Sequence, residues 1–224
     1  MLEDGLSYPV RGDWLGRTLI GGVLGLLSVF VIPTVVVLGY LVRVLETTVE
    51  GADEPPAFED WTALLVRGVV ASVIVIAYTL VPVLAYLVVL AVFFGAGGII
   101  GGDVGALVGV AGVLAALGLI PVVLVVYYAV PAALTAYATQ GSIGAAFDVS
   151  VLRPVVLRSE YLIAVLAPLV VAVLLWVVTA VLAVTIVGLL LVPFVQFYGQ
   201  VAVFRMFGAA FATARGSPGT RRAV

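Results

Sequence analysis

The sequence predicts an all-α, polytopic transmembrane helix bundle with about five to six membrane segments, and three observations predict it. First, 64% of the 224 residues are hydrophobic and only 10% are charged, whereas soluble domains are nearer half apolar and about a quarter charged. Second, four uncharged runs of 25 to 44 residues separate the charged residues (18–42, 68–102, 104–147 and 161–204), and roughly 20 helical residues cross a bilayer. Third, segments such as Leu162–Val178 are apolar on all sides, whereas strands of a membrane barrel alternate.

The first membrane segment is expected at Thr18–Leu45 and to be kinked or re-entrant at Pro33. Proline inside a helix removes a hydrogen bond and bends the helix. The segment is therefore either one long bent span or a short hairpin that returns to the side it entered from. Before it, Asp13 and Trp14 are typical of a short helix at the membrane interface.

An acidic loop, Glu46–Asp60, follows and is stiffened by Pro55 and Pro56. Phe58–Arg67 is expected to form a short interfacial amphipathic helix, and Gly68–Phe94 the next span, kinked near Pro82. Asp13-Trp14 precedes Gly21 by the spacing at which Asp60-Trp61 precedes Gly68, which indicates a weak internal repeat.

The second half continues with a glycine-rich turn at Gly95–Gly102, which holds five glycines, and a returning span at Val104–Tyr128. Residues 129–160 are expected to be a connection with an amphipathic interfacial stretch at Phe147–Glu160. The last two spans are expected at Tyr161–Ala183 and Leu189–Phe211, joined near Gly188. Residues 1–215 thus form a single integral membrane domain, and residues 216–224 a disordered tail.

Arginine positions predict the topology, because cytoplasmic loops collect basic residues. If Thr18–Leu45 spans once, Arg11 and Arg17 lie opposite the other eight arginines; if it returns, all ten lie on one side. We favour the returning form. Either form places the protein in the cell membrane as a multi-pass protein with a cytoplasmic C-terminus, and no removable signal peptide is expected.

All ten basic residues are arginine, and six of the twelve acids fall within Glu46–Asp60. An acidic surface without lysine fits a halophilic protein facing concentrated salt, although a genome rich in arginine codons gives the same lysine deficit. An acidic balance also predicts no nucleic-acid partner.

The residue types needed for intramembrane catalysis are missing from the uncharged runs. The chain has no cysteine and no histidine, so it lacks the usual nucleophile, base and metal ligands. The acidic loop does not follow the EF-hand spacing, and Gly95–Gly102 lacks the lysine of a P-loop. We therefore expect no enzyme activity, no catalytic or metal site and no cofactor.

Two sets of glycines are candidates for close helix packing, since small residues four apart let helices approach. They are Gly21 with Gly25, and Gly101 with Gly105 and Gly109. Their contacts are either internal or between copies in a homo-oligomer.

The last uncharged run contains two amides, Gln196 and Gln200, four residues apart and therefore on one helix face. Exposing both to lipid would be costly, so this face is predicted to point into the bundle. This face either makes polar contacts between helices or lines a polar path or docking groove, with Tyr198 and Arg205 at its cytoplasmic end.

Short motifs spread over residues 7–212 carry a family resemblance. They are Tyr8-Pro9, Asp13-Trp14, Ile20-Gly21-Gly22, Ile32-Pro33, Gly39-Tyr40 with Arg43, the acidic loop to Trp61 and Gly68, Phe147, Tyr161-Leu162, and Pro193 through Phe197-Tyr198. With these motifs the chain resembles an archaeal membrane family catalogued as "domain of unknown function 4013". The resemblance implies a haloarchaeal source and supplies no activity and no functional residues.

Two functions follow as hypotheses. The first is a non-enzymatic membrane protein that assembles with itself or with partner subunits in the lipid bilayer, as a scaffold or accessory subunit. The second is a transporter or permease component for a small solute, suggested by the mid-membrane prolines and the repeat.

Overall fold

The computed structural model describes residues 2–216, and all regular secondary structure in that range is helical. The chain divides into two compact units. The main unit contains the residues up to Ile74 and from Pro131 onward, and the hairpin unit is Val75–Val130. Their boundaries fall inside two long helices, α4 (Trp61–Val89) and α7 (Ile120–Gln140).

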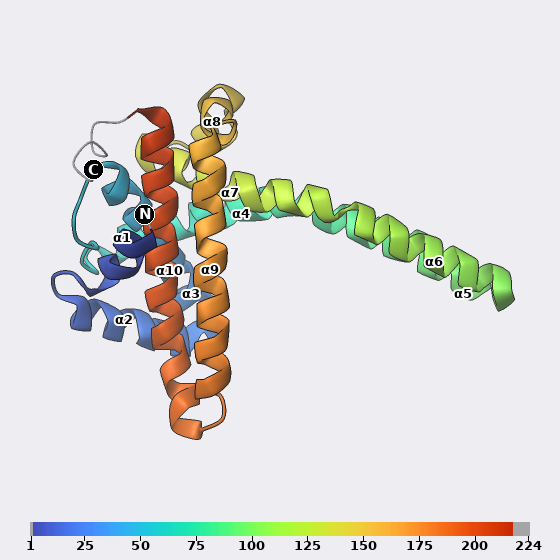
Figure 1. Ribbon diagram of the computed structural model, residues 1–224, viewed down its shortest axis with the longest axis horizontal. Coiled ribbons are helices and arrows are strands. Elements are labelled where there is room, and N and C mark those ends of the chain that lie inside the picture. Colours follow the sequence, from blue (N-terminus) through green and yellow to red (C-terminus); the bar gives the residue numbers. More distant parts are fainter. Residues whose placement is uncertain (1, 217–224) are drawn as a thin grey trace. The chain divides into compact units, whose positions relative to one another are not determined.

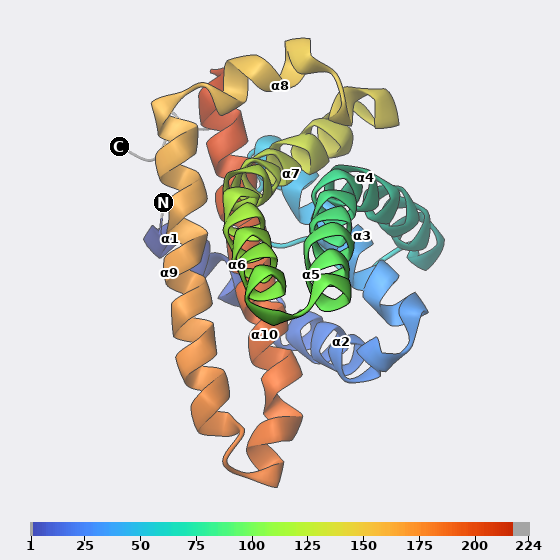
Figure 2. The ribbon, with the colours of Figure 1, turned by 90° about the vertical axis from the view of Figure 1, so that its right-hand side faces the viewer.

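The main unit is built around α10 (Ile186–Arg215), which packs antiparallel against α9 (Ser159–Leu182). Figures 1 and 2 show these two helices side by side. Against α10 also pack α2 (Trp14–Leu26) and α3 (Val31–Val49). The turn between α9 and α10 is closed by Thr185, whose side-chain oxygen accepts a hydrogen bond from the backbone N–H of Gly188 at 2.9 Å.

The remaining short helices of the main unit precede α2 or α9. Before α2 come α1 (Leu2–Ser7) and the 3₁₀-helix η1 (Tyr8–Val10). Before α9 come η4 (Ile143–Ala146) and α8 (Val149–Val156), and Asp148 caps α8. Helix α8 falls within the stretch Phe147–Glu160 for which an interfacial amphipathic element is predicted.

The segment Thr18–Leu45 consists of two helices whose break does not lie at Pro33. Helix α2 ends in the 3₁₀-turn η2 (Leu27–Val29), and Phe30 is extended, with φ −91° and ψ 139°. Pro33 lies in the first turn of α3, where a missing N–H costs no helical hydrogen bond. The proline therefore follows the break instead of causing a mid-helix kink.

Both Asp-Trp pairs begin helices. The side chain of Asp13 accepts a hydrogen bond from the N–H of Gly16 at the start of α2, and that of Asp60 from Ala63 at the start of α4. The separate amphipathic helix expected at Phe58–Arg67 is not present, because α4 runs from Trp61 to Val89 without interruption. Residues 61–67 are instead its first two turns.

Helices α3 and α4 cross through a reciprocal pair of glycines. A Cβ on Gly39 would overlap the carbonyl oxygen of Leu64, and one on Gly68 would overlap the carbonyl oxygen of Val35. Only glycine permits this approach of two backbones.

The hairpin unit holds the end of α4, a π-helical turn η3 (Leu90–Phe94), α5 (Gly95–Ile100), α6 (Gly102–Gly118) and the start of α7. Most of the stretch Gly95–Gly102 is helical, contrary to the predicted eight-residue turn. The reversal is confined to Gly101 and Gly102, with φ of 68° and 58°, and it joins α5 to α6 in Figure 2.

The connection expected at residues 129–160 is shorter than predicted, because α7 continues to Gln140. Pro131 and Thr135 lie buried inside this helix, and the Thr135 hydroxyl donates to the carbonyl of Pro131 at 2.7 Å. Hydroxyl groups bonded in this way are tolerated within helices.

Four helical stretches of the described chain are long and apolar enough to cross a membrane: Val31–Val49, Trp61–Ile100, Gly102–Gln140 and Ile186–Arg215. Two shorter apolar stretches are Trp14–Val29 and Pro168–Leu182. At the C-terminus Gly216 ends α10 in the left-handed conformation, and residues 217–224 of the expected tail lie outside the described residues.

Candidate functional site: an amide-lined cavity beside α10

A cavity of about 540 Å³ lies between α2, α3 and α10 in the main unit. Most of its wall is aliphatic or aromatic. Four uncharged polar side chains also line it: Ser28, Thr34, Gln196 and Gln200. The amide face of the last helix therefore borders a cavity.

The two amides have different surroundings. Gln196 is half-buried, and its Nε2 donates a hydrogen bond to Oγ1 of Thr179 on α9 at 2.9 Å. Gln200, one turn further, is exposed and has no hydrogen bond to any of the described residues. Gln196 thus joins two helices, whereas the Gln200 carboxamide is free to bind something else.

The break between α2 and α3 forms another part of the cavity wall. The Thr34 hydroxyl donates to the carbonyl of Ser28 at 3.2 Å, and it also lies 3.4 Å from the carbonyl of Phe30. Such bonds occupy carbonyls that the interrupted helix leaves without partners.

Glycines bring α2 close enough to α10 to form one side of the cavity. A Cβ on Gly21 would overlap the ring of Phe197, one on Gly22 would overlap Phe194, and one on Gly25 would lie 3.0 Å from Cβ of Pro193. Gly21 and Gly25 therefore face a helix of the same chain.

The other predicted glycine set does not act together. Gly101 forms the turn, with no atom within 4 Å of an added Cβ, and Gly109 is equally open. Gly105 packs inside the hairpin unit, where a Cβ would overlap the carbonyl of Gly97, and the backbone N of Gly109 would lie 3.5 Å from a Cβ on Gly97. The four-residue spacing fails here because α6 begins only at Gly102, so Gly101 is not on its packing face.

Tyr198 and Arg205 do not line the cavity with the two amides. At 100° per residue, Tyr198 lies roughly 200° from Gln196, and Arg205 roughly 140° from Gln200. The Tyr198 hydroxyl instead donates to the carbonyl of Leu6 in α1. Arg205 also contacts the N-terminal segment.

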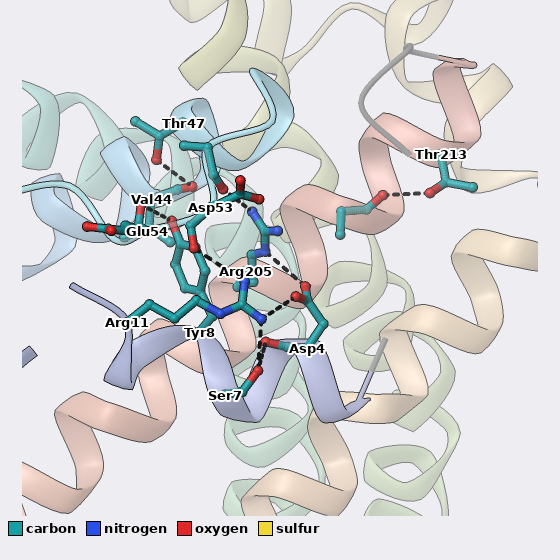
Figure 3. Close-up of polar contacts among 12 residues, drawn as sticks. Asp4, Ser7, Tyr8, Arg11, Val44, Thr47, Asp53, Glu54, Arg205 and Thr213 are labelled. Carbon is teal, nitrogen blue, oxygen red and sulfur yellow. Dashed lines mark hydrogen bonds and ion pairs between the residues drawn. The ribbon is translucent and has the colours of Figure 1, made fainter. Parts of the chain in front are cut away.

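Arg205 is the centre of a polar cluster with Asp4, Tyr8 and Arg11 (Figure 3). Its Nε lies 3.2 Å from Oδ2 of Asp4, its Nη1 donates to the carbonyl of Ala52 at 2.8 Å, and its guanidinium lies 4.5 Å from the centre of the Tyr8 ring. The side chain of Arg205 is only 12% exposed. Arg11 completes the cluster, because its Nη2 bonds the other Asp4 oxygen at 2.7 Å and Oγ of Ser7 at 2.9 Å.

The titration of this cluster follows from burial and charge. Burial alone would raise the pKa of the Asp4 carboxyl, but hydrogen bonds and charges from Arg11 and Arg205 outweigh it and hold the pKa below its ordinary value. Burial raises the pKa of Tyr8, whose hydroxyl donates to the carbonyl of Glu54 at 2.9 Å. These contacts join the N-terminal residues to α10 and to the acidic loop.

Two further arginines, Arg17 and Arg43, contact the acidic loop from the two ends of the segment Thr18–Leu45. Arg17, just before it, lies 3.7 Å from the Glu54 carboxylate and donates to the carbonyl of Arg11 at 2.9 Å. Arg43, near its end, donates to the carbonyl of Glu59 at 3.3 Å. The acidic loop therefore contacts the chain both before α2 and at the end of α3.

Sequence reasoning did not find Asp4, Ser7 or Arg11, and it noted Tyr8 only as part of a motif. These residues are ordinary polar types near the start of the chain, with no spacing that points to Arg205. In the sequence, only the Tyr8-Pro9 motif marks this region.

Among the described residues, no group of three or more His, Cys, Asp or Glu side chains is arranged to hold a metal ion. Glu46, at the start of the acidic loop, lies in α3 and forms an ion pair with Arg67 of α4. The acidic loop is thus partly neutralised by arginine.

Comparison with known proteins gives one match. The model of a family described as "Protein of unknown function (DUF4013)" matches residues 25–184. No curated protein and no solved structure matches the chain.

Proposed function

The chain belongs to the family of proteins of unknown function DUF4013, and from its own geometry we propose that it is a multi-pass membrane protein that works by assembly, as a scaffold or accessory subunit, and not by catalysis. The four long apolar helical stretches support the membrane part of this proposal. The hairpin unit supports the assembly part.

The contacts of Arg17 and Arg43 with the acidic loop support a re-entrant arrangement of the first segment. Arg17 and Arg43 flank that segment, and both contact the acidic loop, at Glu54 and Glu59. A segment whose two ends meet at one loop returns to the side it entered from. Because arginine collects on the cytoplasmic side, we place this cluster and the C-terminus in the cytoplasm.

Open glycines on the hairpin unit are the observation that carries the assembly proposal. Inside the hairpin, Gly105 packs on Gly97 and Gly112 on Phe93. Gly98 and Gly109 have no atom within 4 Å of an added Cβ. Each arm of the hairpin covers only one stripe of the other arm, so the remaining faces contact lipid or further helices. Gly109 lies one turn from Gly105 and borders the internal contact, with open space beside it. Small residues at such positions let another membrane helix approach closely.

A crosslinking experiment tests this proposal. Because the chain has no cysteine, a probe that reacts with thiols attaches only at the introduced position. Gly109→Cys would carry a maleimide-linked diazirine and be irradiated in native membranes. Leu107→Cys is the matched control, because position 107 lies roughly 200° away on the same helix. We expect a discrete protein adduct from position 109 and none from position 107. Lipid adducts alone at both positions would contradict assembly through this face.

A permease component for a small solute is the second candidate, and the cavity favours it. Transporter sites are commonly formed where helices are interrupted, and here the break between α2 and α3 borders two amides. The uncharged runs contain no acid, histidine or basic residue, so any flux should not be proton-driven. A solute flux in proteoliposomes that collapses with the pH gradient alone, at fixed voltage, would contradict this.

The surface charge supports a protein that works in concentrated salt. Acidic side chains such as Glu3, Glu50 and Asp53 are exposed, whereas Arg11, Arg17 and Arg205 are at least half-buried. Thermal unfolding of the purified protein should therefore shift upward between low and molar potassium chloride, because salt screens the repulsion among the acids. An unchanged unfolding temperature would favour the alternative that a genome rich in arginine codons explains the absence of lysine.

A further inference from the structure

The cavity between α2, α3 and α10 has the composition of a binding site for a particular class of molecule. Its volume of about 540 Å³ falls within the range of small-molecule sites, roughly 300 to 1,000 Å³. Such sites combine apolar walls with a few polar groups that fix orientation. The apolar wall here includes Leu24, Val37, Leu38, Leu41, Val192 and Phe204.

The polar part of the lining sets the charge of the occupant. Every lining residue is uncharged, so a charged group inside the cavity would lose its hydration without gaining a counter-ion, which costs far more than burying a neutral polar group. An uncharged group that both donates and accepts hydrogen bonds fits two carboxamides and two hydroxyls.

Gln200 is the group that most needs an occupant. It has no hydrogen bond to the described residues and stands among apolar side chains. Gln196 already uses an N–H on Thr179, and the Thr34 hydroxyl is used on Ser28. The carboxamide of Gln200 and the hydroxyl of Ser28 are therefore the lining groups without a hydrogen bond to the described residues, and the carboxamide offers both donors and an acceptor.

The surroundings of the cavity indicate from where the occupant enters. Ser28 lies in the lining, and the residues that follow it, Val29 and Phe30, are 89% and 64% exposed. Such exposed apolar side chains beside an opening suit contact with hydrocarbon and not with water. A molecule arriving here would come from the bilayer.

We propose that this cavity binds an uncharged lipid, with a hydrocarbon chain along the aliphatic wall and a small hydroxyl head on the amides of Gln200 and Gln196. This binding site goes beyond the proposed assembly function and does not depend on the hairpin unit. The hydroxyl donates to a carboxamide oxygen and accepts from a carboxamide N–H, so both kinds of amide atom are used.

Three photoreactive probes test the proposal with the full chain purified into nanodiscs. They share one long diazirine-bearing chain and differ in the head: a hydroxyl, a carboxylate, or hydrogen only. After irradiation, the labelled peptides are located by mass spectrometry. We expect the alcohol to label peptides of α2, α3 and α10 about tenfold more efficiently than the alkane, because one hydrogen bond in an apolar site contributes on that order. We expect the carboxylate to label them least.

Variants separate head-group recognition from simple partition into the cavity. Gln200→Leu removes no hydrogen bond within the described chain, so the protein should fold and the alcohol should label it no better than the alkane. Gln140→Leu is the matched control, since Gln140 is exposed at the end of α7 and does not line the cavity; its labelling should be unchanged. Val37→Phe narrows the cavity with the amides intact, and labelling by both neutral probes should fall.

Equal labelling of the wild-type cavity by alcohol and alkane would overturn the proposal, and this comparison requires no variant. Preferred labelling by the carboxylate would overturn it as well. So would a protein adduct in place of lipid labelling at the same peptides in native membranes, which would make the cavity a docking groove for a partner helix.

Discussion

Nε of Arg205 lies 3.2 Å from Oδ2 of Asp4, although 201 positions separate these residues in the sequence. Arg205 lies in the second half of α10, and Asp4 lies in the six-residue helix α1. An isolated helix of this length is not stable in water. Helix α1 therefore depends on α10 for its fold, through this ion pair and the hydrogen bond from Tyr198 to Leu6.

Replacing Arg205 should destabilise the protein measurably. Arg205→Leu removes the ion pair with Asp4, leaves the carbonyl of Ala52 without its donor and removes the cation above the Tyr8 ring. We expect a loss of about 2 kcal/mol in the free energy of unfolding, measured by denaturant titration in detergent. Arg215→Leu, at the exposed end of the same helix, is the control; it removes only the cation 5.0 Å from the Phe211 ring and should change it by less than about 1 kcal/mol. Equal effects would show that the cluster contributes no specific stability.

Asp4 should make the stability depend on pH in the acid range. Its folded-state pKa lies below its ordinary value of 3.8. The stabilisation is therefore complete above the unfolded pKa and is lost as the pH falls below about 4, through the lowered folded pKa. Asp4→Asn should be less stable than wild type at pH 6, and the difference should shrink toward pH 2.5. Thermal unfolding of both proteins between pH 6 and 2.5 measures this difference, and Glu3→Gln is the control at a neighbouring acid. A stability difference between Asp4→Asn and wild type that stays constant with pH would contradict the lowered pKa of Asp4.

The crossing of α3 and α4 should not tolerate a methyl group. Gly39→Ala and Gly68→Ala each place a Cβ against a backbone carbonyl, which cannot rotate away. We expect each to cost about 3 kcal/mol or more, or to prevent folding. Gly95→Ala, a helical glycine with open space around it, should be neutral or slightly stabilising because alanine favours helix. Size-exclusion profiles and unfolding curves of the three variants give the comparison. Tolerance of alanine at position 39 would show that the backbones are further apart.

Short sequence patterns predicted where helices begin, but they did not predict where a helix continues through a proline. Asp13 and Asp60 precede tryptophans and apolar runs, which is the pattern of an N-cap. Residues 129–160 are predicted to be a connection, yet Pro131 lies inside α7, which continues to Gln140. The prediction fails because one proline removes a single hydrogen bond, which a long membrane helix tolerates.

The break at Leu27–Phe30 could not be predicted from local sequence, since Leu-Ser-Val-Phe contains neither glycine nor proline. It depends on tertiary packing: Gly21 and Gly22 hold α2 on α10, and Gly39 holds α3 on α4. Helix α3 packs on α4 as well as on α10, and this additional contact sets its direction apart from that of α2. Long-range pairs such as Asp4 and Arg205 are beyond pattern reasoning for the same reason, whereas the common face of Gln196 and Gln200 follows from helical spacing alone.

The two flanks of the first segment should be accessible from the same side of the membrane. Glu3→Cys and Asp53→Cys each place one thiol on an exposed position, in α1 and in the acidic loop. We expect a membrane-impermeant maleimide to label both in inverted vesicles and neither in intact cells. Arg215→Cys serves as the reference for the C-terminus and should behave in the same way. Labelling of positions 3 and 53 from opposite sides would show that Thr18–Leu45 spans once.

The bond between Gln196 and Thr179 should contribute a modest and specific stability. The amide Nε2 donates to the threonine hydroxyl at 2.9 Å and links α10 to α9. Polar contacts between membrane helices average about 0.6 kcal/mol and reach about 1.7 kcal/mol. A double-mutant cycle with Gln196→Leu and Thr179→Val, measured by unfolding in detergent, should give a coupling energy in that range. Gln200→Leu with Thr179→Val is the matched cycle and should be additive, because Gln200 does not bond Thr179. If the first cycle is additive as well, Gln196 does not join the helices, and both amides would then be free to serve the cavity.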